Sequence, residues 1–167
     1  MKDAVYDEMT VTQRELKRKT ILLKLAGGMI NALLDGLGGA DAETRRRVME
    51  GCGVACAHEE HWGPAIEIAD RIASEEPDEA GRLERTNREI QWCGKWTRVG
   101  GAIQSTCTEC GCLLVNQGVV KMNATLCLCS RGWVKTIFET LLGKPVRVEL
   151  EKAIGRGDDI CRYVVQT

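Results

Sequence analysis

The fold of this chain is decided by residues 130–165, which read SRGWVKTIFETLLGKPVRVELEKAIGRGDDICRYVV. Apolar residues at three- and four-residue steps predict a helix over Ser130–Leu142 with one apolar stripe. Gly143 is the residue expected just after the helix end, and Pro145 bars the helix from continuing. Two runs in which apolar and polar residues alternate follow, at 146–151 and 161–165. The Gly/Asp turn between these runs predicts an antiparallel hairpin.

Cys161, Tyr163 and Val165 alternate in the second run and therefore share one face of the predicted hairpin. We expect this face to pack on the apolar stripe of the helix at 130–142. Cys161 is then a core residue, and replacing it with alanine is expected to cost about 1–2 kcal/mol of stability without changing metal content. At least one glycine of the turn at 155–159 is expected to need a positive φ.

Upstream of this stretch, the first half of the chain is predicted to be helical. Three helices are expected from the apolar periodicity, over 12–37, over 42–58 and from 64 onward. Gly27 and Gly28 lie inside the first of these and indicate a kink or a close helix contact. Asp41 is the expected N-cap of the second helix, and Pro64 suits the first turn of the third.

The segments between these helices and residue 130 are less regular. Residues 75–89 are charged and predict a short solvated helix or a linker. Residues 90–103 predict one bent strand or a hairpin, and Leu113–Val120 a short strand. The predicted fold class is therefore α+β, with N-terminal helices packed on a C-terminal antiparallel sheet that carries a long helix. A helical region at 1–89 and a cysteine-rich α/β region at 90–167 are expected to form one compact domain.

Composition excludes several classes of function. The 167 residues carry 23 basic and 24 acidic side chains, so no broad attraction to nucleic acid is expected. Residues 1–10 contain no apolar stretch of the kind that begins a secretory signal. The longest apolar stretch, Ile21–Leu34, is interrupted by Lys24 and Asn31 and is shorter than the roughly 20 residues of a membrane span. We therefore expect a cytoplasmic protein that binds neither nucleic acid nor membrane.

Nine cysteines are the outstanding feature of the composition. In a reducing compartment they indicate metal binding or catalysis more than a disulfide framework. Five of them fall between residues 107 and 129, among Gly, Thr, Glu and Ser rather than in an apolar run. We predict a four-thiolate metal site formed by Cys107, Cys110, Cys127 and Cys129, with Cys112 as the substitute fourth ligand. Zinc is the expected metal and an iron–sulfur cluster the alternative. A redox pair at Cys107 and Cys110 is a further interpretation.

A second candidate group lies in the helical half. Cys52 and Cys56 are four residues apart and share one helix face, and both histidines of the chain, His58 and His61, follow closely. These four residues could hold a metal, or Cys52 and Cys56 could meet Cys127 and Cys129 in a mixed site. An ordinary buried helix face with two surface histidines explains the same pattern. Buried Cys residues without a ligand role are expected at Cys93 and Cys161.

The C-terminal motifs resemble a known family. They are Cys129-Ser-Arg-Gly-Trp133, the Gly143-Lys-Pro-Val turn with its acidic strand, and the Gly157–Cys161 hairpin segment. Together they are similar to the 4-vinyl reductase domain, to the end of the aminothiazoline-carboxylate hydrolases and to uncharacterised cysteine-rich proteins of anaerobes. The segment Cys52-Gly-Val-Ala-Cys56 looks most like the last group.

This resemblance implies a ligand-binding α/β fold with an antiparallel sheet flanked by helices, often as a dimer. Its small-molecule sensors carry a structural zinc bound by the final cysteine, by a cysteine eight residues earlier and by an acidic residue. The final cysteine corresponds to Cys161, but Ala153 stands eight residues before it, and Glu149 or Glu151 would take the acidic role. The complete site of the sensors is therefore absent from this sequence.

Two functions follow as hypotheses. The first is a metal-containing domain that binds or senses a small molecule in an apolar cleft. The alternative is a small hydrolase or other enzyme that uses a cysteine, or a metal bound by cysteine, on a small sulfur- or nitrogen-containing substrate. The sequence names no catalytic residue. The broad apolar stripe of the helix at 12–37 predicts a homodimer, and a helical dimer module without chemistry is a third interpretation.

Overall fold

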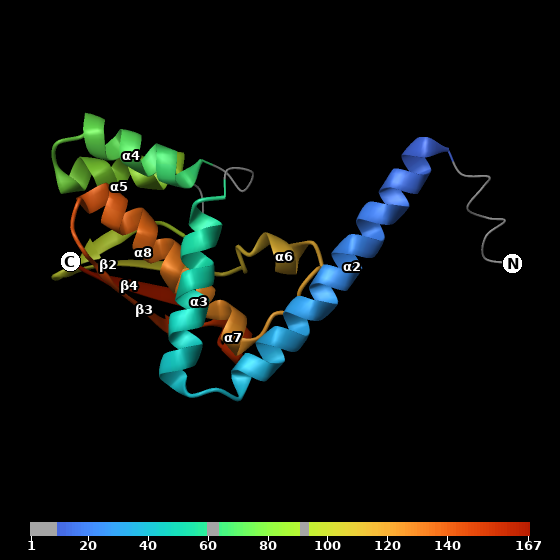
Figure 1. The fold of residues 1–167 in the computed structure, drawn as a ribbon. Coiled ribbons are helices and arrows are strands. Elements are labelled where there is room, and N and C mark those ends of the chain that lie inside the picture. Colours follow the sequence, from blue (N-terminus) through green and yellow to red (C-terminus); the bar gives the residue numbers. More distant parts are fainter. Residues whose placement is uncertain (1–9, 60–63, 91–93) are drawn as a thin grey trace, which may run out of the picture.

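A computed structural model describes residues 10–59, 64–90 and 94–167. Its centre is a four-stranded antiparallel sheet with strand order β1-β2-β4-β3. The strands span Thr97–Val99 (β1), Ala102–Cys107 (β2), Arg147–Lys152 (β3) and Cys161–Gln166 (β4). Helix α8 (Cys129–Leu142) crosses one face of the sheet, and α3 (Ala42–Ala57) packs against α8 (Figure 1). The predicted α+β class is confirmed.

The hairpin of β3 and β4 forms as predicted. Val148 pairs with Val165, and Leu150 pairs with Tyr163. A short 3-10 helix, η2 (Ile154–Arg156), and Gly157 make the turn, and Gly157 has a φ of +94°. That conformation favours glycine because a side chain would clash with the backbone. On its other side β4 pairs with β2, which sets Cys161 opposite Cys107.

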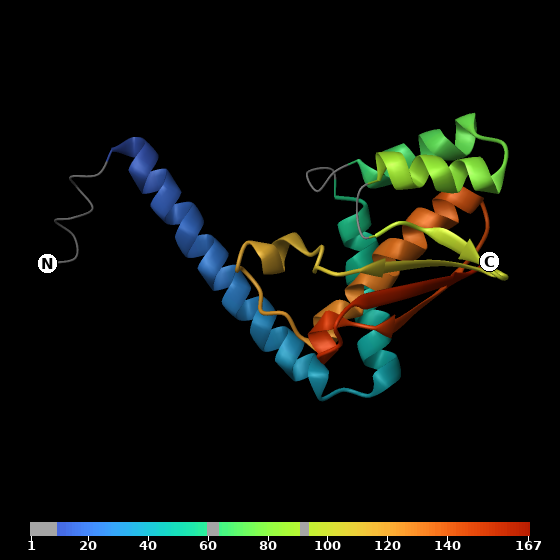
Figure 2. The same ribbon diagram turned by 180° about the vertical axis from the view of Figure 1, so that it is seen from behind.

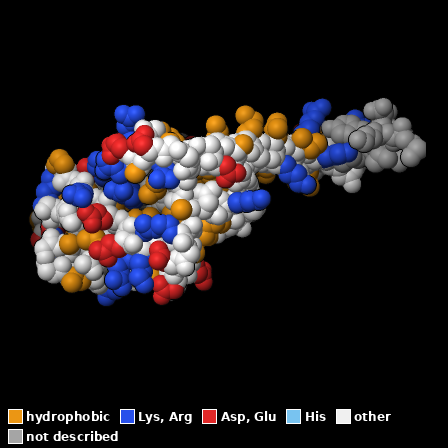
Figure 3. All heavy atoms as spheres, turned by 90° about the horizontal axis from the view of Figure 1, so that it is seen from below, with side chains coloured by type: hydrophobic (Ala, Val, Ile, Leu, Met, Phe, Trp, Pro, Cys, Tyr) orange, Lys and Arg blue, Asp and Glu red, His pale blue; other side chains and the backbone are white. Residues whose placement is uncertain are grey.

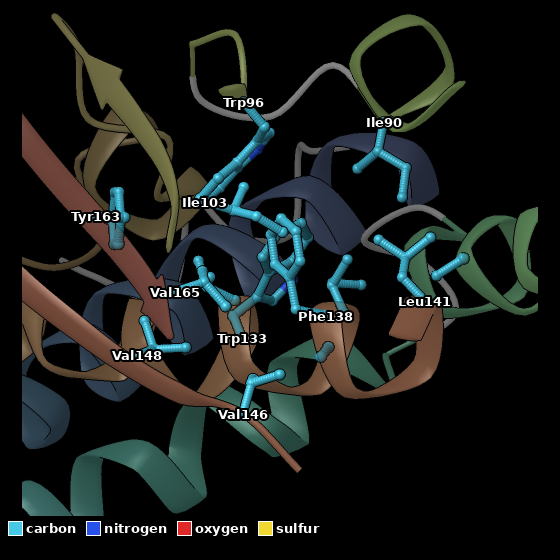
Figure 4. Close-up of a cluster of buried hydrophobic side chains, with 14 of the residues drawn as sticks. Ile90, Trp96, Ile103, Trp133, Phe138, Leu141, Val146, Val148, Tyr163 and Val165 are labelled. Atoms are coloured by element: carbon cyan, nitrogen blue, oxygen red, sulfur yellow. The ribbon is translucent and has the colours of Figure 1, made fainter. Parts of the chain in front are cut away.

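Packing of α8 on the sheet builds the main core. Cys161, Tyr163 and Val165 are buried against α8, as their alternation predicted. Figure 4 shows Trp133 and Phe138 of α8 between the strands and the segment that carries Trp96. The rings of Trp96 and Phe138 meet edge to face with centroids 4.7 Å apart, an arrangement that adds to the free energy of burial.

The helical half covers α8 from the side opposite the sheet. Helix α4 (Ala65–Glu75) packs on α8, and α5 (Glu79–Glu89) packs on α4. Asp41 caps α3 through the amides of Glu43 and Thr44, as predicted. The charged segment at 75–89 contains a regular helix, and Arg82 of that helix donates to the carbonyls of Glu76, Ala73 and Leu141. These bonds fix α5 to the end of α8.

One prediction between residues 90 and 128 is corrected. Leu113–Val120 is not a strand: α6 (Leu113–Asn116) is a helical turn, and a second one, α7 (Ala124–Cys127), precedes α8. A short apolar run does not distinguish a strand from a helical turn, and here the local backbone bonds favour the turn. Of the two forms expected for 90–103, the described part has the hairpin, with Gly100 at a φ of +59° between β1 and β2.

Helix α2 (Val11–Gly38) leaves the body of the molecule (Figures 1 and 2). Its C-terminal part packs through Leu34 on Met49, Val120 and Leu126, which form a second buried cluster. At Gly27 an added Cβ would overlap the carbonyl oxygen of Val119, so this glycine permits a close backbone contact, with the segment after α6 rather than with another helix as predicted. The apolar side chains of the N-terminal part are exposed along the protruding rod in Figure 3.

Length and composition alone would also allow α2 to cross a membrane, and it is the one helix among the described residues that passes this test. The stretch Ile21–Leu34 has only 14 residues, but it lies within the 28-residue helix α2, which carries further apolar residues. Only 11% of the apolar window is buried within the chain. Most of the apolar face of α2 is therefore exposed in the structure that residues 10–59, 64–90 and 94–167 form.

Candidate functional site

A cavity of about 800 Å³ lies where α2, α3, α7 and α8 meet the end of the sheet. Helix α2 provides one wall with residues between Ile30 and Leu37, and α3 provides another with residues between Val48 and Cys56. The loop after β2, residues 109–112, and the start of β4 complete the lining. Most of these side chains are apolar, which is typical of a small-molecule pocket.

Every cysteine that the structure describes lines this cavity. They come from α3, β2, the following loop, α7, α8 and β4: Cys52, Cys56, Cys107, Cys110, Cys112, Cys127, Cys129 and Cys161. Both cysteine groups predicted from the sequence are thus brought to one place, together with Cys161. Cys93 lies outside the described residues.

The cysteines differ in their bonding state. Cys107 is bound in a disulfide, so its sulfur is not a free thiolate in this structure. The other cysteines of the lining carry free thiols. The predicted set of Cys107, Cys110, Cys127 and Cys129 therefore offers three free thiols rather than four. Among the described residues, no group of three or more His, Cys, Asp or Glu side chains is already arranged to hold a metal ion.

Cys110, Cys127 and Cys161 form one set of thiols, which we call the turn set. Each sulfur accepts a backbone N–H. Cys161 Sγ accepts from Ile154 at 3.4 Å, Cys127 Sγ from Gly155 and Cys110 Sγ from Cys112. The amides of Ile154 and Gly155 belong to η2, so the hairpin turn supplies donors for two of the three sulfurs. Hydrogen bonds of this kind stabilise a thiolate.

Burial opposes ionisation of two of these thiols, those of Cys127 and Cys110. It raises the pKa of Cys127 to about 11, with the Gly155 amide acting against it. Burial also raises the pKa of Cys110. These sulfurs are therefore protonated thiols at neutral pH, which makes them weak nucleophiles. The alternative of a catalytic cysteine gains no support from them.

Cys52, Cys56, Cys112 and Cys129 form a second set, which we call the helix set. Cys52 and Cys56 lie on α3, Cys112 is the N-cap of α6, and Cys129 is the first residue of α8. Burial raises the pKa of Cys129 strongly, and the nearby charges of Cys112, Cys56, Cys127 and Cys52 raise it further. The pKa of Cys56 is raised by burial and then by Cys112 and Cys52.

Hydrogen-bonding groups are few in the lining. The Tyr163 hydroxyl donates to Ser130 Oγ at 2.9 Å, and Ser130 Oγ donates to the carbonyl of Cys127 at 2.7 Å. Burial raises the pKa of Tyr163, so the phenol stays neutral. Glu109 is the carboxylate of the lining. A ligand would therefore meet apolar side chains, thiols, two linked hydroxyls and one acid.

The structure separates His58 from the second predicted group. His58 is exposed at the end of α3 and is not part of the cavity lining, and His61 lies outside the described residues. Sequence reasoning missed the wall supplied by α2 and the pair of Ser130 and Tyr163. The inward face of β4 could have indicated Tyr163, but no local pattern shows that residues 30–37 meet the cysteines.

Comparisons with known proteins agree with this architecture. The phenol-responsive sensory domain of the transcription activator PoxR, in a crystal structure with phenol, is 16% identical to this chain. The match covers 86% of this chain and 73% of that one with a TM-score of 0.52, which shows a shared fold. No curated protein matches. The resemblance to the 4-vinyl reductase domain stays a prediction. Residues 70–166 match DUF6144, described as a family of unknown function, and because this is more than half of the chain, the protein belongs to that family.

Proposed function

We propose that this protein is a metal-containing domain that binds or senses a small molecule in the cysteine-lined cavity. The observation that carries the proposal is the cavity itself. Its volume of about 800 Å³ falls in the range of roughly 300–1,000 Å³ in which ligand pockets are found. Its lining is mainly apolar. The few polar groups in such a pocket fix the orientation of the bound ligand. The shared fold with a sensory domain supports the same proposal.

The lining defines the class of ligand. A small, mostly apolar molecule fits the walls, and one hydrogen-bonding group on it could meet Ser130 or Tyr163. Because Glu109 is the single carboxylate of the described lining, a strongly anionic ligand is disfavoured at that end of the cavity. We therefore expect neutral aromatic or aliphatic molecules to bind better than their carboxylate analogues.

The metal part of the proposal rests on the turn set. Soft thiolates select zinc and iron–sulfur clusters, and backbone amides directed at the sulfurs are the second layer of contacts that such sites use. The zinc set of the sensors that the C-terminus resembles does not fit, because the buried methyl group of Ala153 stands where a cysteine ligand would be. Cys110 offers a third sulfur from a different segment. Elemental analysis and an absorbance spectrum of anaerobically purified protein distinguish colourless zinc protein from a brown cluster.

Ligand binding is tested with two tryptophan variants. Leu114 lines the cavity, whereas its neighbour Leu113 is 47% exposed and does not. We expect L114W to fill part of the cavity and to abolish the thermal shift that small phenols and related neutral aromatics cause in the wild type. L113W should keep the shift. If no neutral apolar molecule in a broad panel raises the thermal midpoint of the wild type, small-molecule binding in this cavity is refuted.

We also propose that a second copy of this chain covers α2. Leu22, Leu25 and Met29 are each more than half exposed on this helix, and burying such a face is the usual driving force of association. Leu33 is 70% exposed and also lines the cavity, so a second copy seated on α2 would close the cavity at that side. The shared face makes dimer formation and ligand binding interdependent.

A further inference from the structure

We propose that the cavity selects a small apolar molecule that carries a hydrogen-bond donor, such as a hydroxyl or an N–H group, and that Ser130 Oγ accepts this donor. The inference rests on the proposed function, because it concerns the ligand of the same cavity. It goes further by naming the chemical group that the ligand must present. The observation that carries it is the direction of two hydrogen bonds in the cavity lining.

Ser130 and Tyr163 both line the cavity, and their hydroxyls belong to one chain of hydrogen bonds. Ser130 Oγ lies 2.7 Å from the carbonyl oxygen of Cys127, and Tyr163 Oη lies 2.9 Å from Ser130 Oγ. A carbonyl oxygen carries no proton, so Ser130 must donate in the first of these bonds. Because Ser130 has only one hydroxyl proton, Tyr163 must donate in the second.

The secondary structure holds this chain of hydrogen bonds in place. Helix α7 ends at Cys127 and α8 begins at Cys129, so the carbonyl of Cys127 lies at the junction of two helices, where the Ser130 side chain meets it. Tyr163 reaches Ser130 from β4 and is only 3% exposed. Burial raises the pKa of Tyr163, so the phenol keeps the proton that it donates. Both hydroxyl protons are therefore committed within the protein.

A hydroxyl oxygen whose proton is committed can still accept hydrogen bonds. It has two lone pairs, and the bond from Tyr163 uses one of those on Ser130 Oγ. Because Ser130 lines the cavity, a second donor can come from a bound molecule. A ligand group that only accepts, such as an ether or a ketone oxygen, would instead direct its own lone pair at that of Ser130.

The rest of the described lining offers no strong side-chain donor to a ligand. It contains no Lys, Arg, His, Asn or Gln, and its carboxylate, Glu109, only accepts when it is ionised. The indole nitrogen of Trp133 is covered by protein atoms and is not exposed to the cavity. Thiols are weak donors. The polar groups that a ligand meets are therefore acceptors, and a ligand that brings its own donor is complementary to them.

The test compares two ligands of the same shape by isothermal titration calorimetry. Indole presents one N–H donor, and benzofuran has an accepting oxygen in place of that N–H. We expect the wild type to bind indole about threefold to tenfold more tightly, which is the effect of one hydrogen bond between neutral groups. If the cavity admits only a single ring, phenol and fluorobenzene form the equivalent pair.

Two variants test whether the preference comes from Ser130. S130A removes the accepting oxygen, so the preference for indole should disappear. Y163F is the matched control, because it removes the other hydroxyl of the pair but leaves the Ser130 proton on the carbonyl of Cys127. The preference should therefore persist in Y163F. Comparing the two dissociation constants within each variant cancels any change in the cavity that affects both ligands equally.

The outcomes separate this inference from the proposed function. If the wild type binds benzofuran as tightly as indole and L114W binds neither, the donor preference is overturned and the small-molecule cavity stands. A preference for indole that persists in S130A overturns the role of Ser130. If no neutral molecule binds the wild type, the proposed function fails and this inference fails with it. If S130A does not fold, S130C replaces it, because sulfur keeps the shape of the side chain but is a weak acceptor.

Discussion

The contact between α3 and α8 at Gly53 allows a sharp prediction, because the two helices touch backbone to backbone there. In Gly53→Ala the new Cβ would overlap the carbonyl oxygen of Cys129 and lie 2.8 Å from the amide nitrogen of Trp133. Neither obstacle is a flexible side-chain end, so α3 must move away from α8. Overpacking of this kind costs about 1–3 kcal/mol, and the backbone obstacles place Gly53→Ala at the upper end, at about 3 kcal/mol.

A gain in helix propensity acts against this cost. Alanine is favoured over glycine in a helix interior by about 1 kcal/mol, so the net loss expected for Gly53→Ala is about 2 kcal/mol. Gly51 is the matched control, because it lies on the same helix, is exposed and has nothing within 4 Å of an added Cβ. Gly51→Ala should stabilise the protein by about 0.5–1 kcal/mol.

Urea denaturation followed by tryptophan fluorescence measures both variants. The reasoning fails if Gly53→Ala and Gly51→Ala change the free energy of unfolding by the same amount.

Three further predictions concern other parts of the molecule. Cys161→Ala should release the metal of the turn set and therefore lower stability by more than the roughly 1–2 kcal/mol of a lost core sulfur. A loss of only that size with unchanged metal content would support the sequence-based expectation that Cys161 is a core residue. Glu89 accepts hydrogen bonds from Arg85 and Arg88, and together with Arg71 they lower its pKa to about 2. Its stabilising effect should be complete above pH 4.5 and be lost as the pH falls through 2, so Glu89→Gln should be less stable than the wild type at pH 7 and equally stable near pH 2 in thermal melts. L22E/L25E places charges on the exposed face of α2 and should shift the mass found by light scattering from that of a dimer to that of the 18.4 kDa monomer. If the wild type is itself a monomer and sediments with anionic vesicles, the partner of α2 is a lipid surface and not a second copy.

Local sequence patterns were enough to predict those helices, turns and strands whose sequence signals lie within a few residues of one another. The stripe over Ser130–Leu142, the glycine after it and the alternation in 161–165 predicted α8 and the hairpin, and all three are present. Asp41 capped α3 as expected because capping depends on amides two and three residues away. The backbone geometry of one helix or turn fixes the relative positions of such residues, so the segments that pack against it have little influence on these contacts.

Tertiary structure decided the cysteine sites, because their members are distant in sequence and meet only when α3 packs on α8. Spacing suggested that Cys127 and Cys129 share an ion and that the histidines accompany Cys52 and Cys56. The packing of Gly53 on Cys129 brings the α3 thiols beside the start of α8, and the turn at η2 directs its amides at Cys127 and Cys161. The run at 113–120 forms a helical turn with local backbone hydrogen bonds, and packing on α2 and α3 buries its apolar residues in that form. Apolar burial is non-directional and acts between segments that no local sequence period connects. Which segments pack together is therefore decided by the tertiary structure, whereas the sequence alone was compatible with several pairings.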